Sequence, residues 1–411
     1  MEPPRGDVAE DSSRVQAPCS CPVFRGTSGP VLCGTSSRGG QAIAGRPRNV
    51  PSVRRRVPTP FRQLTFRWLL VLVPLSIAAA VLGRWPLVTF LLAGAALLPL
   101  AELIGSATQQ IGLHAGPRVG GLLNATFANV TEFILAIVLV LHGETAVVKT
   151  ALTGSILGNL LLVLGLALLA GGARHRVQRY SAAAAGVHAT SLTLAVIGLL
   201  MPALFFLTGG RPSVGQSEAV SVTVAMVLIV LYGAALLFTQ RTHEHLFQTP
   251  ASGERPECSR AWAIGVLAAA SVVVAIESQL LVATLEPAIG VLGFSKFFTG
   301  LILIPLFGNV VEHSAAVRFA LRDQLDVTLE IAIGSSTQIA LFVAPALVLI
   351  SLAAGHPMDF IFTTFEVAAV GLSVLIVTFI SHDGQSNWLE GAQLLAAYAI
   401  MAASAFFVTS S

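Results

Sequence analysis

The sequence predicts an all-α polytopic membrane protein with about eleven transmembrane helices, arranged as two inverted five-helix repeats plus one extra N-terminal helix. Composition is the first reason. The 411 residues are 54% hydrophobic and only 11% charged, with a mean hydropathy of +0.78, whereas a soluble domain carries about 25% charged residues. The second reason is a polar signature that occurs twice, at equivalent places in two apolar segments.

The N-terminal segment differs in composition from the rest of the chain. Residues 1–62 are rich in Pro, Gly, Ser and Arg without periodicity, which predicts a disordered basic tail. An arginine cluster precedes the first apolar run, so the positive-inside rule places the N-terminus in the cytoplasm; it consists of Arg54, Arg55, Arg56, Arg62 and Arg67. Nucleic-acid binding is the weaker interpretation of this cluster, and we expect no nucleic-acid partner. A bacterial plasma membrane is the expected location, with a vacuolar membrane as the alternative.

Eleven apolar runs follow, each close to the roughly 20 residues that a helix needs to cross a bilayer. The extra helix and the first repeat are predicted over 66–239, a cytoplasmic linker over 240–261 and the second repeat over 262–409. The predicted spans are 66–83, 86–112, 118–142, 145–172, 182–208, 217–239, 262–285, 297–321, 326–353, 360–381 and 389–408.

The duplicated signature is an Asn three residues before a Glu. Asn129 and Glu132 recur as Asn309 and Glu312, 180 positions later. Five spans, an odd number, separate the two copies, so equivalent helices are expected to cross the membrane in opposite directions. Each Asn and Glu share one helix face, and a Glu at the centre of a span costs roughly 3 kcal/mol or more to insert. Two buried carboxylates of this kind therefore predict a shared functional site.

The residue types at this site suit a hard cation. If the two helices cross near the midplane, two carboxylates and two amides converge, and Ca²⁺ prefers six to eight oxygen ligands in a flexible geometry. The alternative for the glutamates is a buried ion pair with Arg318. Helix breaks that expose backbone carbonyls are expected at Gly120–Gly121 and near Pro305 and Gly308.

Further polar residues on the same and following spans complete the candidate cation site. Ser155 and Ser335 are candidate ligands, although small polar residues also serve simple helix packing. Asn159 and Gln338 are candidate ligands, with hydrogen bonding between helices as the alternative. His313 follows Glu312 directly and has three possible roles: a polar partner, a cation ligand or a proton relay.

These motifs resemble those of the Ca²⁺/H⁺ exchanger (CAX) family of the cation/Ca²⁺ exchanger superfamily. The segment 120–132 follows the family pattern G-G-L-L-N-A-T-F-G-N-A-T-E, except at Ala128 and Val130, and 308–313 follows G-N-A-A-E-H. The resemblance covers roughly 66–408. It implies eleven spans in two inverted five-helix repeats, with Glu132 and Glu312 as the cation-binding carboxylates.

The chain also departs from the family pattern. Gln109 stands where many members carry a Glu, and Ala283 stands where members often carry an Asp. These missing carboxylates bear on cation choice and on the proton route. The linker is also less acidic than the family's usual segment, which gives no support for regulation by cytosolic Ca²⁺ there.

The predicted function is proton-coupled antiport that exports Ca²⁺ from the cytosol in exchange for H⁺ by alternating access. Inorganic cations and the lipid bilayer are the expected partners, and no cofactor is expected beyond the transported Ca²⁺ and H⁺. No G-x-x-x-x-G-K-[ST] motif is present, so ATP-driven pumping is not predicted. The alternatives are an antiporter of the same fold that carries Na⁺, K⁺ or Mn²⁺, an intramembrane enzyme, or a passive channel. The sequence leaves the oligomeric state open.

Overall fold

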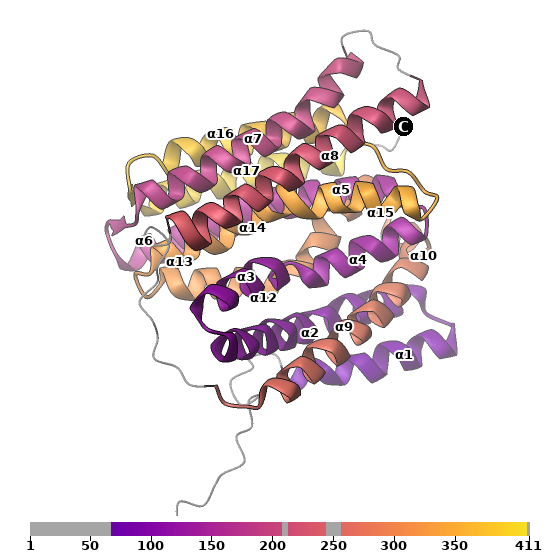
Figure 1. Ribbon diagram of the computed structural model, residues 1–411. Coiled ribbons are helices and arrows are strands. Elements are labelled where there is room, and N and C mark those ends of the chain that lie inside the picture. The colour runs from indigo at the N-terminus through magenta and orange to yellow at the C-terminus, as the bar shows by residue number, and fades with distance from the viewer. Residues whose placement is uncertain (1–66, 208–212, 244–255, 409–411) are drawn as a thin grey trace, which may run out of the picture. The chain divides into compact units, whose positions relative to one another are not determined.

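The computed structural model describes residues 67–207, 213–243 and 256–408 as a helical assembly (Figure 1). The predicted disordered tail, the arginines before position 67 and most of the predicted linker lie outside these ranges. The first half contains α1 (Leu72–Leu82), α2 (Pro86–Ala115), α3 (Pro117–Phe127), α4 (Val130–Leu141), α5 (Thr145–Leu157), α6 (Leu164–Arg174), α7 (Ala182–Leu207) and α8 (Val214–Leu237).

The second half is the described chain from position 256 onward. It contains α9 (Arg260–Ala283), α10 (Leu285–Leu292), α11 (Lys296–Phe298), α12 (Ile304–Ala320), α13 (Leu325–Leu329), α14 (Ser335–Gln338), α15 (Ala344–Ala353), α16 (Thr364–Ile380) and α17 (Trp388–Phe406). A short 3₁₀ segment, Arg67–Val71, precedes α1. Strands β1 (Gln178–Arg179) and β2 (Gln385–Ser386) pair antiparallel, with Gln178 opposite Ser386.

Several of these helices are joined by π-helical turns into longer continuous rods. Gly158–Val163 connects α5 to α6, Phe238–Thr242 extends α8, and Thr299–Leu303 connects α11 to α12. Two further turns, Glu330–Gly334 and Ile339–Val343, flank α14. π turns in helices are rare and cluster at functional sites. Their presence beside the duplicated motifs is therefore consistent with a functional site in this part of the fold.

Helix lengths agree with a multi-pass membrane protein. In the described part of the chain, eight helices are long and apolar enough to cross a bilayer, and three shorter apolar helices cover Trp68–Leu82, Val130–Leu141 and Thr364–Ile380. All eleven predicted runs coincide with helical segments, but the exact count of eleven spans is not confirmed because three of them are short.

The helix break in the first repeat differs from the predicted one. Helix α3 runs without interruption through Gly120 and Gly121, and the chain leaves the helix only at Ala128–Asn129, before α4. An added Cβ at Gly120 would lie 3.1 Å from the carbonyl oxygen of Gly112. The glycine therefore lets α3 pack closely on α2, and it does not break the helix.

The corresponding segment of the second repeat has no gap. The π-helical turn Thr299–Leu303 continues directly into α12, whose second residue is Pro305; because proline has no amide hydrogen, one hydrogen bond of the continuous helix is missing there. The predicted break near Pro305 and Gly308 is therefore wrong; the helix is distorted before the proline and regular after it.

Close backbone contact between the repeats fixes the position of these segments. A Cβ at Gly154 on α5 would overlap the carbonyl of Leu301, and a Cβ at Gly300 would overlap the side chain of Thr150. Phe307 on α12 packs edge-on against Phe90 of α2, with ring centroids 5.9 Å apart. These contacts hold α5 and α2 of the first repeat against the Thr299–Leu303 turn and α12 of the second repeat.

Candidate cation site

The two glutamates lie at different places in their helices. Glu132 is in the first turn of α4, directly after the break, whereas Glu312 lies in the middle of the uninterrupted α12. Both side chains are partly buried. Asn309 of the second repeat donates to Glu132, and Ser335, which contacts Glu312, also donates to Asn129 of the first repeat. The predicted convergence of the two Asn-x-x-Glu motifs is therefore present in the structure.

The carboxylate of Glu132 is held mainly by residues of other segments. Ser155 on α5 donates its hydroxyl to Oε1 of Glu132 at 2.7 Å, and Asn309 on α12 donates its Nδ2 to the same oxygen. An added Cβ at Gly308 would lie 2.8 Å from Cγ of Glu132. Gly308 therefore provides room for the carboxylate of the other repeat, a role that the sequence analysis missed.

The carboxylate of Glu312 has an equivalent serine. Oγ of Ser335 lies 3.3 Å from Oε2 of Glu312 and 2.7 Å from Oδ1 of Asn129. The serine has one proton, so it serves one of these oxygens at a time. Asn159 donates its Nδ2 to the same Oγ at 3.3 Å. Ser155 and Ser335 therefore hold equivalent positions beside the two glutamates.

The network departs from symmetry at Gln338. Asn129 donates its Nδ2 to Oε1 of Gln338 at 2.8 Å, and Gln338 donates its Nε2 to the backbone carbonyl of Thr126 at 3.2 Å. The residue 180 positions before Gln338 is Gly158. The glutamine thus satisfies a carbonyl at the end of α3, beside the break, and holds Asn129 at the same time.

His313 and Arg318 are not part of this network. Nε2 of His313 is buried without a hydrogen-bond partner in the described chain, so this nitrogen forms no hydrogen bond to either glutamate among the described residues. Nor does any ion pair among the described residues join Arg318 to Glu132 or Glu312. The structure therefore gives no support to a buried Glu–Arg pair.

The two carboxylate oxygens of Glu132 differ in their contacts. Its Oε2 is buried and has no hydrogen-bond partner in the described part of the chain, although buried polar atoms are normally satisfied. The described residues contain no cluster of three or more His, Cys, Asp or Glu. A cation here would thus be held by two carboxylates together with neutral amide and hydroxyl oxygens, which suits a hard cation.

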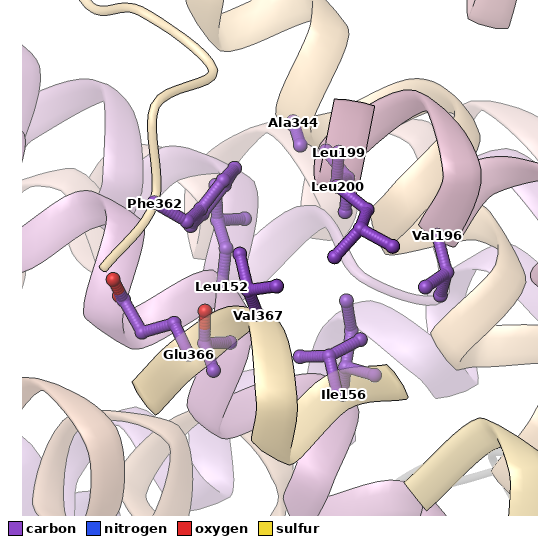
Figure 2. Close-up of a pocket in the computed structure, with 11 residues that line it drawn as sticks. Leu152, Ile156, Val196, Leu199, Leu200, Ala344, Phe362, Glu366 and Val367 are labelled. Atoms are coloured by element: carbon purple, nitrogen blue, oxygen red, sulfur yellow. The ribbon is translucent and has the colours of Figure 1, made fainter. Parts of the chain in front are cut away.

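A separate pocket lies between α5, α7, α15 and α16 (Figure 2) and contains none of the predicted site residues. Its lining is apolar except for Thr153 and Glu366. Oε2 of Glu366 accepts hydrogen bonds from the amide and the hydroxyl of Thr363, which completes a capping box at the start of α16. This carboxylate therefore has a structural role in helix capping.

Known proteins are similar to this chain over nearly all of its helical part. The family described as "Sodium/calcium exchanger protein" matches residues 85–240 and 262–407. The chain is 45% identical over 360 residues to the Ca(2+)/H(+) antiporter of Synechocystis sp., covering 83% of this chain and 97% of the relative. It is 44% identical over 362 residues to the Ca(2+)/H(+) antiporter of Aphanothece halophytica, covering 83% and 96%.

A solved structure agrees with the fold. The selenium-substituted Ca2+/H+ antiporter YfkE superposes with a TM-score of 0.72 at 36% identity, covering 84% of this chain and 99% of that chain. The resemblance inferred from the duplicated motifs is confirmed by these matches. This chain belongs to the sodium/calcium exchanger protein family.

Proposed function

We propose that this protein is a secondary active transporter that exports Ca²⁺ from the cytosol in exchange for H⁺. The observation that carries the proposal is the cross-repeat contact in which Asn309 and Ser155 hold Glu132, with Ser335 beside Glu312. The relatives named Ca(2+)/H(+) antiporters support the same activity, and an antiporter is a transporter, not an enzyme.

The proposed exchange is competition between Ca²⁺ and protons for the same oxygens. Deprotonated Glu132 and Glu312 hold the cation, and a protonated carboxyl is a poorer ligand because it has lost its charge. Protonation therefore releases Ca²⁺, and the neutral site returns across the membrane. Alternating access then requires one group of helices to move around the site.

The neutral side chains have distinct proposed roles. Asn129, Asn309, Ser155 and Ser335 offer oxygens to the cation once their present hydrogen bonds rearrange. Asn159 and Gln338 orient these ligands, since the structure uses their amides for Ser335, Asn129 and the Thr126 carbonyl. His313 is proposed as a proton acceptor next to Glu312.

The topology belongs to the same proposal. The N-terminus is cytoplasmic. Residues 66–239 form the extra helix and the first repeat, residues 262–409 form the second, inverted repeat, and residues 240–261 form the cytoplasmic linker between them. A bacterial plasma membrane is the proposed location, which the close bacterial relatives support.

Flux into proteoliposomes tests the function. Purified protein is reconstituted, the membrane potential is clamped with valinomycin and K⁺, and ⁴⁵Ca²⁺ uptake is followed with and without a pH gradient. Uptake should follow the pH gradient, and Glu132→Gln and Glu312→Gln should each abolish it, whereas Glu218→Gln on α8 should not. Uptake that does not depend on the pH gradient but depends on a Na⁺ gradient would show that Na⁺, not H⁺, is the counter-ion. Competition by Mn²⁺, Na⁺ or K⁺ would identify a different transported cation.

A further inference from the structure

One segment of the second repeat contacts the chain on both sides of the break between α3 and α4. Gln338 ends α14, and Phe342 lies four residues later, in the π-helical turn that follows. Gln338 bonds to the carbonyl of Thr126 before the break and to Asn129 within it. Phe342 packs against Phe133 in the first turn of α4, with ring centroids 6.0 Å apart. The two side chains therefore span the break.

The ring of Phe342 is supported from a third helix. Tyr232 on α8 stacks on Phe342, with ring centroids 5.1 Å apart and an interplanar angle of 24°. The hydroxyl of Tyr232 forms a side-chain hydrogen bond with Thr126, the residue whose carbonyl accepts from Gln338. Aromatic pairs in this arrangement contribute more than their burial alone. Phe133, Phe342 and Tyr232 therefore form an aromatic stack that connects α4, the second repeat and α8.

The first repeat has no counterpart of these two side chains. Gly158 lies 180 positions before Gln338, and Leu162 lies 180 positions before Phe342. The motif helix of the second repeat, α12, is uninterrupted, so its own backbone hydrogen bonds hold it together. At the break these bonds are missing, because helix ends leave backbone groups without intrahelical partners. The glutamine and the phenylalanine thus belong to one repeat alone, and they contact the motif helix that is broken.

We propose that Phe342 is a positioning residue for Glu132, and that together with Gln338 it holds the break so that the first turn of α4 stays at the cation site. Glu132 directly precedes Phe133, so the ring contact restrains the backbone that carries the carboxylate. A ligand held in place in advance binds more tightly, because less conformational freedom is lost on binding.

Hydrogen–deuterium exchange of the full-length protein in detergent tests this restraint without Ca²⁺. Phe342→Leu removes the ring and introduces the residue type found at the equivalent position 162. Amide exchange in a peptide covering 122–136 should become roughly three- to tenfold faster, because local opening controls exchange and an aromatic contact contributes about this factor. A peptide covering 306–318, in the unbroken α12, should exchange as in the wild type. Phe342→Tyr keeps the ring and should keep exchange slow.

Phe406→Leu provides the matched control for the loss of a ring. Phe406 on α17 also packs edge-on against another ring, that of Phe298, with centroids 5.3 Å apart. This variant should leave exchange at 122–136 unchanged. Wild-type exchange at 122–136 in Phe342→Leu overturns the proposal. An equal rise in both peptides also overturns it, because such a rise reflects a general loss of stability and no local restraint at the break.

Equilibrium Ca²⁺ binding tests the positioning role, and this part rests on the proposed function. Isothermal titration calorimetry on the purified full-length variants should give a Kd for Phe342→Leu roughly three- to tenfold above that of the wild type. Phe342→Tyr and Phe406→Leu should stay within about twofold. A role in packing alone would lower the melting temperature of Phe342→Leu and leave its Ca²⁺ affinity unchanged.

The outcomes separate this proposal from the proposed function. A Kd for Phe342→Leu within about twofold of the wild type overturns the positioning role. Wild-type protein that binds no Ca²⁺ overturns the proposed function, while the exchange experiment still decides whether Phe342 holds the break.

Discussion

Asn309 on α12 donates its side-chain amide to Glu132 on α4, so one repeat orients the carboxylate of the other. The reciprocal contact does not form, because Asn129 donates its amide to Gln338. Each glutamate is nevertheless matched to a serine 23 positions later, Ser155 or Ser335. The site is therefore built from two copies of one motif that have diverged in their amide contacts.

This asymmetry predicts unequal effects of two equivalent substitutions. Asn309→Ala removes a hydrogen bond to a carboxylate, a contact that contributes about 1.5–3 kcal/mol, so Ca²⁺ affinity should fall roughly 10- to 100-fold. Asn129→Ala removes a contact to a neutral glutamine and should cost less affinity. Equilibrium Ca²⁺ binding by isothermal titration calorimetry on both purified variants provides the comparison. Equal losses would show that the asymmetry in the hydrogen bonds has no effect on cation binding.

Glycine contacts between the repeats predict a second set of effects. A methyl group at Gly154 or Gly300 would overlap Leu301 or Thr150, and overpacking of this kind typically costs about 1–3 kcal/mol. Gly154→Ala and Gly300→Ala should therefore lower the melting temperature in detergent by several degrees and reduce transport.

Gly158 provides the matched control for these substitutions. It is also buried and lies on the same continuous helix as Gly154, but an added Cβ there would meet no atom within 4 Å. Gly158→Ala should melt at or above the wild-type temperature, since alanine favours helix more than glycine. A Gly154→Ala variant as stable as Gly158→Ala would contradict the close contact between α5 and the Thr299–Leu303 turn.

The span positions and the polar residues of the site could be predicted from the sequence, because both depend on local composition and on a duplicated motif. The position of the helix break could not. Glycine pairs indicate either a break or close helix packing, and only the tertiary contact between Gly112 and Gly120 distinguishes the two. The break at Ala128–Asn129 has no glycine or proline and is accompanied by a contact from Gln338, 212 positions after Thr126.

The extra N-terminal helix is joined to the second repeat by a buried polar contact. Ser76 on α1 donates its hydroxyl to Oε1 of Glu277 on α9 at 2.8 Å, and both side chains are fully buried. Ser76→Ala leaves the carboxyl of Glu277 without this donor, and such a loss costs about 1–3 kcal/mol. The melting temperature should fall, whereas the double variant Ser76→Ala/Glu277→Leu should recover most of it. A double variant as unstable as Ser76→Ala would show that the contact contributes nothing specific.

Lys296, the first residue of α11, forms a pH-sensitive ion pair with Glu286 of α10. Nζ of Lys296 lies 2.6 Å from Oε1 of Glu286 and 3.1 Å from Oε1 of Glu144. The hydrogen bond from Lys296, reinforced by its charge, lowers the pKa of Glu286 below the ordinary glutamate value, which is about 4.3. A lowered pKa in the folded state stabilises the protein at pH values above the ordinary pKa, and this stabilisation is lost as the pH falls through the lowered pKa.

Glu286→Gln should therefore melt slightly below the wild type at pH 7, and the difference should shrink as the pH is lowered below about 4. The effect should be small because the pair is exposed and screened by salt. Melting temperatures of the two proteins from pH 7 to pH 3.5 provide the measurement, with Glu218→Gln as the control for removing a carboxylate elsewhere. A difference that grows as the pH falls would reverse the sign of the linkage and contradict a lowered pKa at Glu286.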